Sequence, residues 1–296
     1  MANYVKRGGL KIEMVMQQHF AEGRELTPDE LLALVEQALK NPRKLKYKGE
    51  LLVGVDLGTA YVVVVVLDSE MMPLAGAMRF AQVVRDGLVV DYTGAIRIVR
   101  EMLTEIEERV GCELVYAATG YPPGVPLVEV QSTRHVVEAT GLKVVAMLDE
   151  PTAANAVLKI RDGAVVDIGG GTTGIAILEE GEVVYVADEP TGGIHFSLVI
   201  AGAGNISLEE AEEIKVRPEN QEALFPVVRP VMQKVASIIR RHVEGKGVKA
   251  IYLVGGTSSF QRIDRIIEEE VGIKTYRPSR PLFVTPLGIA MNCKIL

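Results

Sequence analysis

The chain has 296 residues, of which 48% are apolar, and a formal net charge of −7. This length predicts two lobes with separate cores rather than one average domain. The acidic balance and the scattered Lys and Arg residues argue against nucleic acid or an anionic membrane as the main partner. Cys112 and Cys293 show no metal-ligand spacing, and neither a signal peptide nor a membrane-spanning run is evident. We therefore expect a cytoplasmic protein.

Residues 1–48 are expected to form a helical N-terminal extension. Thr27 and Glu30 have the spacing of a capping box, Pro28 stands at the first helical position, and apolar residues follow at helical spacing up to Leu39. A weaker amphipathic stretch covers residues 10–20. Two interpretations stay open: these helices pack on the main body, or one of them docks on a partner.

Residues 49–162 are expected to form a first lobe in which three strands precede alternating helices and strands. Residues 85–92 are expected to form a loop. The expected elements are strands at 52–57, 61–67 and 73–82, a helix at 94–110, a strand at 114–119, a helix at 126–139, a strand at 143–148 and a helix that begins at Glu150.

Residues 163–296 are expected to form a second lobe that repeats this order. The expected elements are a hairpin at 164–178, a strand at 182–188, a helix after Gly192-Gly193, a helix capped by Ser207, a helix at 226–243, a strand at 250–254, a helix at 259–271, a strand at 273–276 and a helix at 285–292. Two similar halves of this length indicate a duplicated fold, not a solenoid.

The stretch from Asp167 to Thr173 is the most informative one in the chain. An apolar run leads into Gly169-Gly170-Gly171, and a β-branched run follows. Glycines let an anion approach the backbone closely, and successive amide groups then point at it. Asp167 would lie where a metal ion on a bound phosphate needs a carboxylate. Taken alone, the stretch is also compatible with a plain solvated turn.

A second copy of this plan occurs upstream, where Asp56 is followed by Gly58-Thr59-Ala60 and a run of five valines. Two such hairpins facing each other would clamp a polyphosphate from both sides. A third Gly-rich turn, Gly255-Gly256-Thr257, follows the strand at 250–254 and is a further candidate ligand site.

These motifs, together with Glu150-Pro151-Thr152-Ala153-Ala154, resemble those of the actin-like ATPase superfamily, which includes actin, DnaK-type chaperones and bacterial filament proteins. The resemblance covers about residues 50–293 in the superfamily's motif order. It implies an α/β protein with a duplicated actin-like (ribonuclease H-like) fold, whose two lobes enclose a nucleotide cleft. The expected cofactors are ATP and Mg²⁺.

More narrowly, several stretches resemble a family of bacterial ethanolamine-utilisation proteins. They are 83–87, 121–124, 149–153, 167–177, 206–212 and 285–287. This resemblance implies a chaperone-like protein linked to ethanolamine breakdown in a bacterial microcompartment. The partners that it implies are ethanolamine-pathway enzymes or microcompartment proteins.

The resemblance also assigns roles to individual residues. It implies that Asp56 and Asp167 hold Mg²⁺ through water, that Glu150 polarises the attacking water, and that Pro122 belongs to a turn that couples the lobes. Without it, Glu212 and Lys215 would be read as a surface ion pair. The residues that it places around the nucleotide are Gly58, Thr59, Ala60, Gly169, Gly170, Gly171, Thr172, Thr173, Gly192, Gly193, Glu212, Lys215, Gly255, Gly256 and Thr257.

Two departures from the superfamily pattern concern this cleft. Gly174 stands where chaperones and filament proteins usually have an acid, and Ser259 stands where the chaperones place an Arg against adenine. The short segment between Glu212 and the expected helix at 226–243 also predicts a reduced adenine-side subdomain in the second lobe.

The function expected from these motifs is slow Mg²⁺-dependent ATP hydrolysis, with lobe closure driving a partner-binding cycle. One alternative is an assembly or scaffold factor that binds nucleotide without significant hydrolysis, which the Gly174 departure favours. Another is a reactivating factor for a cobalamin-dependent ammonia-lyase. A filament-forming protein and a sugar kinase are further alternatives, although no sugar-binding insert is evident.

Overall fold

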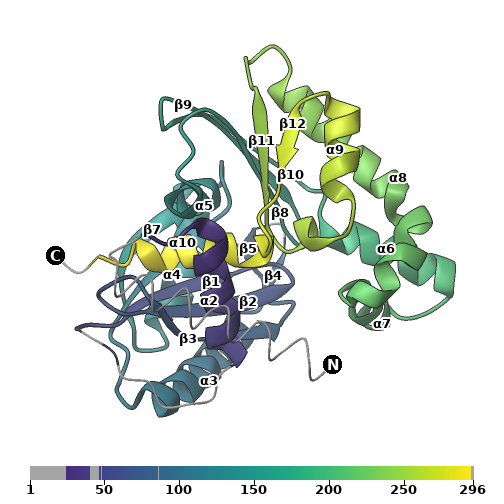
Figure 1. The fold of residues 1–296 in the computed structure, drawn as a ribbon. Coiled ribbons are helices and arrows are strands. Elements are labelled where there is room, and N and C mark those ends of the chain that lie inside the picture. The colour runs from purple at the N-terminus through teal and green to yellow at the C-terminus, as the bar shows by residue number, and fades with distance from the viewer. Residues whose placement is uncertain (1–24, 41–46, 48, 86, 295–296) are drawn as a thin grey trace, which may run out of the picture.

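The computed structural model describes residues 25–40, 47, 49–85 and 87–294, and it contains two five-stranded mixed sheets. Figure 1 shows that they belong to two halves of the molecule, with α3 and α4 beside one sheet and α6, α8 and α9 beside the other. The stretch at 10–20 lies outside the described residues. No helix within the described part of the chain is long and apolar enough to cross a membrane.

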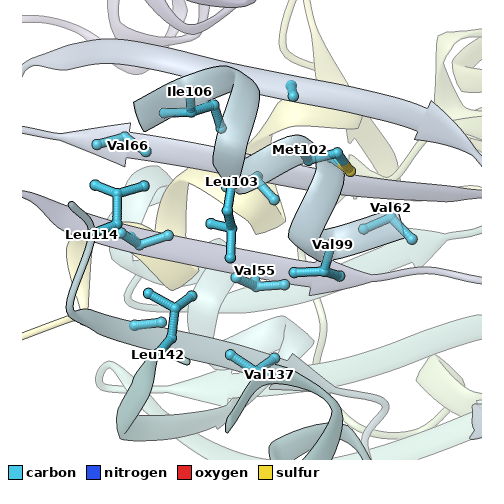
Figure 2. Close-up of a cluster of buried hydrophobic side chains, with 14 of the residues drawn as sticks. Val55, Val62, Val66, Val99, Met102, Leu103, Ile106, Leu114, Val137 and Leu142 are labelled. Atoms are coloured by element: carbon cyan, nitrogen blue, oxygen red, sulfur yellow. The ribbon is translucent and has the colours of Figure 1, made fainter. Parts of the chain in front are cut away.

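The first sheet has the strand order β3-β2-β1-β6-β7. Its strands are β1 (Leu52–Leu57), β2 (Tyr61–Leu67), β3 (Pro73–Phe80), β6 (Tyr116–Tyr121) and β7 (Lys143–Asp149). Strands β1, β2 and β3 pair antiparallel, whereas β6 and β7 pair parallel. Helices α3 (Tyr92–Val110) and α4 (Leu127–Glu138) cover one face. Figure 2 shows part of the resulting core, in which Val55 and Val62 of the strands lie close to Val99 and Met102 of α3.

The second sheet repeats this order as β10-β9-β8-β11-β12. Its strands are β8 (Gly163–Ile168), β9 (Thr173–Glu179), β10 (Glu182–Glu189), β11 (Ala250–Val254) and β12 (Lys274–Tyr276). Helices α6 (Gly193–Gly204), α8 (Pro218–Val243) and α9 (Ile263–Val271) contribute to its core. The duplicated actin-like α/β fold that the repeated hairpins predict is confirmed. The lobe boundaries proposed from the sequence stay a prediction.

A third apolar core lies between the sheets and joins them. It includes residues of α2 (Pro28–Lys40), α5 (Glu150–Leu158) and α10 (Val284–Met291). Although α10 follows the second sheet in the chain, its residues pack against α5 and β1 of the first half. Figure 1 shows this helix, in yellow, beside α2 and the first sheet. The chain therefore returns to its first half before it ends.

Helix α2 packs on the main body, as the first of the two interpretations predicts. Thr27 and Glu30 form the expected capping box: Thr27 N–H donates to Glu30, and Glu30 N–H donates to the Thr27 hydroxyl. Leu32 is fully buried in the core between the sheets. Asp29 accepts hydrogen bonds from the backbone and hydroxyl of Ser279, so this helix also holds the segment that leads from β12 to α10.

Three expectations about local structure were wrong. Helix α8 begins at Pro218, not Pro226, and continues through Pro226 and Pro230. Proline favours the first turn and is costly inside a helix, but α8 continues through both prolines and keeps buried residues on either side of them. Helix α9 begins at Ile263, after a short 3₁₀ turn at Thr257–Ser259. The expected loop at 85–92 contains a short hairpin of β4 (Val84–Arg85) and β5 (Leu88–Val89).

Candidate functional site

A cavity of about 430 Å³ lies between the two halves of the molecule. Its walls come from β1 and β2, from the turn after β8, from α7 (Leu208–Lys215), and from the segments after β11 and β12. The expected site residues that line it are Asp56, Gly58, Thr59, Ala60, Glu150, Asp167, Gly169, Gly170, Gly171, Thr172, Glu212, Lys215, Gly255, Gly256 and Thr257. Residues far apart in the sequence thus meet at one site.

The two Gly-rich hairpins have the same backbone geometry. Gly58 N–H donates to the Tyr61 carbonyl at 3.1 Å, and Gly169 N–H donates to the Thr172 carbonyl at 3.0 Å. In each case the first glycine bonds to the residue three positions later. No hydrogen bond within the described part of the chain uses the intervening amides at 59, 60, 170 and 171. These donors are therefore available to an anion.

The hairpins approach each other so closely that two glycines are required. A Cβ atom at Gly170 would lie 2.8 Å from Ala60 Cβ, and one at Gly171 would lie 3.0 Å from the Thr59 side chain. A larger residue at either position would push the two turns apart. The two turns therefore lie close together, as the sequence predicts, and their grip on a polyphosphate stays a prediction.

Three carboxylates line the cavity, and among the described residues none of them forms an ion pair. Burial raises the pKa of Asp56 to about 7, and the charge of Asp167 adds to the increase. Burial also raises the pKa of Asp167 to about 6. The pKa of Glu150, the first residue of α5, is raised well above its usual value by burial and by the charges of Asp167 and Asp56. The charge of Asp167 thus disfavours ionisation of Asp56 and Glu150.

Mg²⁺ fits this donor set if it is held through water. Lys215 is the basic residue among those that line the cavity, and it is already bound to Glu212. Within the described residues no group of three or more His, Cys, Asp or Glu side chains is arranged to hold a metal ion directly. Mg²⁺ usually keeps several waters and binds through one or two carboxylates and substrate phosphates. Asp56 and Asp167 are suited to that role.

Thr285 of α10 orients Asp167. Its hydroxyl donates to Asp167 Oδ2 at 2.8 Å, and this bond partly offsets the effect of burial on the pKa. On the other side, a Cβ atom at Gly255 would lie 2.1 Å from Asp167 Oδ1, and Gly255 has a φ of +86°. Only glycine both adopts this conformation and leaves room for the carboxylate. Residues from two separate segments therefore fix Asp167.

We expect Thr285→Val to raise the pKa of Asp167 above that of the unchanged protein, because the charged carboxylate loses a donor while the shape is kept. The measurement is the pH dependence of the free energy of unfolding without metal, in which the decline of stability should extend to higher pH. The matched control is Thr104→Val, which removes a hydrogen bond from the hydroxyl to the Arg100 carbonyl on the exposed side of α3. An unchanged pH profile in Thr285→Val would contradict the assignment.

Glu212 and Lys215 form a buried ion pair, not the surface pair that their spacing alone suggests. Lys215 Nζ bonds Glu212 Oε2 at 2.6 Å and the Gly193 carbonyl at 3.0 Å. Ser197 donates to the same Glu212 oxygen at 2.6 Å. Both residues are 8% exposed. The network therefore ties α7 to the start of α6, beside the glycine hairpin.

Three expected site residues do not line the cavity but support its wall. Thr173 is buried in β9 and donates to the Thr191 carbonyl. A Cβ atom at Gly192 would lie 2.8 Å from the Gly169 carbonyl oxygen, and Gly193 N–H donates to that oxygen at 2.9 Å. These residues stand behind the hairpin at Gly169, so the structure places them one layer away from a ligand. Their direct contact with nucleotide stays a prediction.

A side chain at Gly174 would be tightly packed. A Cβ atom there would lie 3.3 Å from Pro123 in the turn after β6. Gly174 pairs with Asp167 on one side and with Asp188 on the other, so the two acids project from the same face of the sheet. The charge of Asp188 adds to the increase in the pKa of Glu150. An acid is thus present on the neighbouring strand.

Sequence reasoning missed several residues that line the cavity. Tyr61 extends from β2, and the charge of Glu212 helps burial to raise its pKa to about 12. Leu282 contacts Gly256 from the segment after β12. Gln221 lies in the first turns of α8 and lines the cavity. It was not identified because the helix was expected to begin only at residue 226. No motif in the sequence singles out these three.

Two duplicated sheets with facing Gly-Thr hairpins and paired acids define the actin-like ATPase class of fold. Within that class, the chain belongs to the EutJ family of ethanolamine utilisation proteins. It is 44% identical to the EutJ protein of Salmonella typhimurium over 239 residues, which cover 80% of this chain and 84% of that one.

One solved structure supports the same assignment, and other comparisons show the fold alone. The structure of EutJ from Carboxydothermus hydrogenoformans has a TM-score of 0.84 and 44% identity, and covers 89% of this chain and 97% of its own. MreB5 of Spiroplasma citri bound to ADP shares the fold, with a TM-score of 0.65 and 17% identity over 82% of this chain and 95% of that one. A family model described as type IV pilus assembly protein PilM matches residues 127–278.

Proposed function

We propose that the cavity binds Mg²⁺–ATP and hydrolyses it slowly, and that closure of the two halves around the nucleotide drives a partner-binding cycle. The observation that carries this proposal is the pair of hairpins with matching Gly58 and Gly169 bonds and unused amides, directly beside Asp56 and Asp167. The amides suit a polyphosphate, but the nearby carboxylates would repel it. A ligand that combines phosphates with a divalent cation satisfies both features.

The chain's own residues suggest how hydrolysis would proceed. The free amides of the two hairpins would hold the phosphates and stabilise the charge that develops on them. Glu150, whose pKa is raised by burial and by the charges of the neighbouring acids, would orient the attacking water and accept its proton. Asp56 and Asp167 would hold the hydrated Mg²⁺, which supplies charge neutralisation at the phosphates when bound. Glu212 Oε2 is already engaged, so its other oxygen would meet the ribose.

The partner part of the proposal rests on the family alone. Relatives are named ethanolamine utilization proteins, so the clients that we propose are ethanolamine-pathway enzymes or microcompartment proteins. A chaperone-like role on these clients would follow from a cleft that changes its opening with the bound nucleotide. Phosphate release measured with and without such enzymes tests this part separately.

The central test is calorimetric binding of ATP with Mg²⁺ and with a chelator, followed by phosphate release. We expect binding that requires Mg²⁺, and a loss of about 100-fold or more in turnover for Asp167→Ala, as for the removal of other transition-state electrostatics. Glu108→Ala, which removes an exposed acid of α3 far from the cavity, is the control. Phosphate release unaffected by Asp167→Ala would overturn the hydrolytic mechanism.

A second candidate function is nucleotide binding without significant hydrolysis, as in an assembly factor. The specific observation that favours it is the absence of a side chain at Gly174, where Pro123 lies close and the neighbouring acid is Asp188 of β10. Tight ATP binding with no phosphate release by the unchanged protein would identify this function.

A further inference from the structure

The cavity changes character away from the glycine hairpins. A chain of contacts leads from Gly169 to Gly193, then to Lys215, and from the Lys215 carbonyl to the side chain of Gln221. Apolar lining residues adjoin this chain of contacts: Val216 follows Lys215, and Phe260 precedes Gln261, whose N–H bonds Gln221. Leu282, beside Gly256, is another. This end of the cavity is mainly apolar, so it suits the flat face of a base and not a phosphate.

Gln221 is the amide side chain in this apolar region. It lines the cavity and is 6% exposed. Its Nε2 donates to the Lys215 carbonyl at 3.2 Å, and its Oε1 accepts from Gln261 N–H at 2.9 Å. If the amide were turned over, its NH₂ group would face the Gln261 N–H and its oxygen would face the Lys215 carbonyl oxygen. The two backbone partners therefore fix which end carries the oxygen.

These two bonds use half of the hydrogen-bonding capacity of the amide. A glutamine side chain has two N–H donors and two oxygen lone pairs, so one of each is left after the bonds to Lys215 and Gln261. A fixed donor beside a fixed acceptor matches a base edge that presents an acceptor beside a donor. Adenine has this arrangement at its 6-amino group and the adjacent ring nitrogen, and glutamine is a common partner for it.

We infer that Gln221 is a specificity-determining residue that reads the 6-position of a purine and makes the site prefer adenine to guanine nucleotides. The inference rests on the proposed nucleotide-binding function. Guanine carries an oxygen at the 6-position, which would face the amide oxygen instead of donating to it. The amide is prevented from turning to accommodate guanine, so the wrong base leaves buried polar groups unpaired.

The experiment compares the affinities of three ligands by calorimetry in the presence of Mg²⁺: ATP, GTP and purine riboside triphosphate, which lacks the 6-amino group. We expect the full chain to bind ATP about tenfold or more tightly than either analogue. In Gln221→Leu the three affinities should fall within about twofold of one another. Ratios taken within one variant cancel any general loss of affinity that the substitution causes.

Gln233→Leu is the matched control, since Gln233 lies on the same helix and bonds Glu270 away from the cavity. It should keep the preference for ATP. If Gln221→Leu fails to fold, Gln221→Met keeps an unbranched chain of similar length, and the comparison of the three ligands on the unchanged protein needs no variant.

Equal affinities in the unchanged protein, a preference for GTP, or a preference that survives in a folded Gln221 variant would overturn the inference while leaving nucleotide binding intact. Absence of binding for all three ligands would instead overturn the proposed function, and the inference with it.

Discussion

Gly288→Ala is expected to lower the free energy of unfolding by at least about 3 kcal/mol. A Cβ atom at this position of α10 would lie 1.8 Å from the Ala153 carbonyl oxygen and 2.5 Å from its carbon, in helix α5. Because these are backbone atoms, no side chain can rotate out of the way. The usual gain of about 1 kcal/mol for alanine over glycine in a helix is too small to offset this clash.

The same helix is equally close to the first sheet. A Cβ atom at Gly54 of β1 would lie 2.5 Å from the backbone nitrogen of Ala290. Helix α10 is thus seated between α5 and β1 without space for a methyl group on either side. Since Thr285 of this helix bonds Asp167, a displacement of α10 would also disturb the cavity.

Urea unfolding followed by circular dichroism measures the effect of Gly288→Ala. The matched control is Gly202→Ala in α6, where a Cβ atom would meet nothing within 4 Å. That control should gain about 0.5–1 kcal/mol, because only helix propensity changes. If Gly288→Ala is as stable as the unchanged protein, the close seating of α10 on α5 is wrong.

The sequence was most informative about features that depend only on residues close together in the chain. The hairpins at Gly58 and Gly169 could be predicted because the turn, the acid before it and the strand after it are all contiguous. Their duplication then predicted the two matching sheets. The capping box at Thr27 and Glu30 could be predicted for the same reason.

Features that depend on packing between distant segments could not be predicted from the sequence. Pro226 suggested a helix start because proline is common in the first turn of a helix. Only the buried face of the whole of α8 shows that the helix continues through this residue. The location of α10 on the first half depends on contacts between distant segments. The same is true of the close approach of Pro123 to Gly174. Gln221 has no motif around it, so its place in the cavity emerges only from the fold.

Asp56→Asn is expected to raise the free energy of unfolding at pH 8, in the absence of metal, by roughly 2–4 kcal/mol. Burial and the charge of Asp167 raise the pKa of Asp56 from 3.8 to about 7. Between these two values the folded protein binds more protons than the unfolded chain, so stability falls as pH rises from about 4 to about 7. At pH 8 Asp56 is ionised, and its full destabilising effect is present.

Asparagine keeps the shape of the side chain but has no charge to bury. The stabilisation should therefore be largest at pH 8, smaller at pH 6, and nearly absent at pH 4, where Asp56 of the unchanged protein is already protonated. Urea unfolding at these three pH values in the presence of a chelator measures it, with Asp162→Asn on the exposed surface as the control. A benefit that is the same at every pH would contradict the assignment.

Because we propose that the cavity binds Mg²⁺–ATP, we expect addition of this ligand to reverse the order of stability of the two proteins. A ligand that binds only the folded state stabilises it by an amount that grows with the logarithm of its affinity. The unchanged protein should gain from the pair of carboxylates, whereas Asp56→Asn should gain less because one of the two acids is lost. A fold that is more stable without Asp56 when empty, and less stable without it when loaded, would show that this buried carboxylate is retained for the ligand and not for the fold.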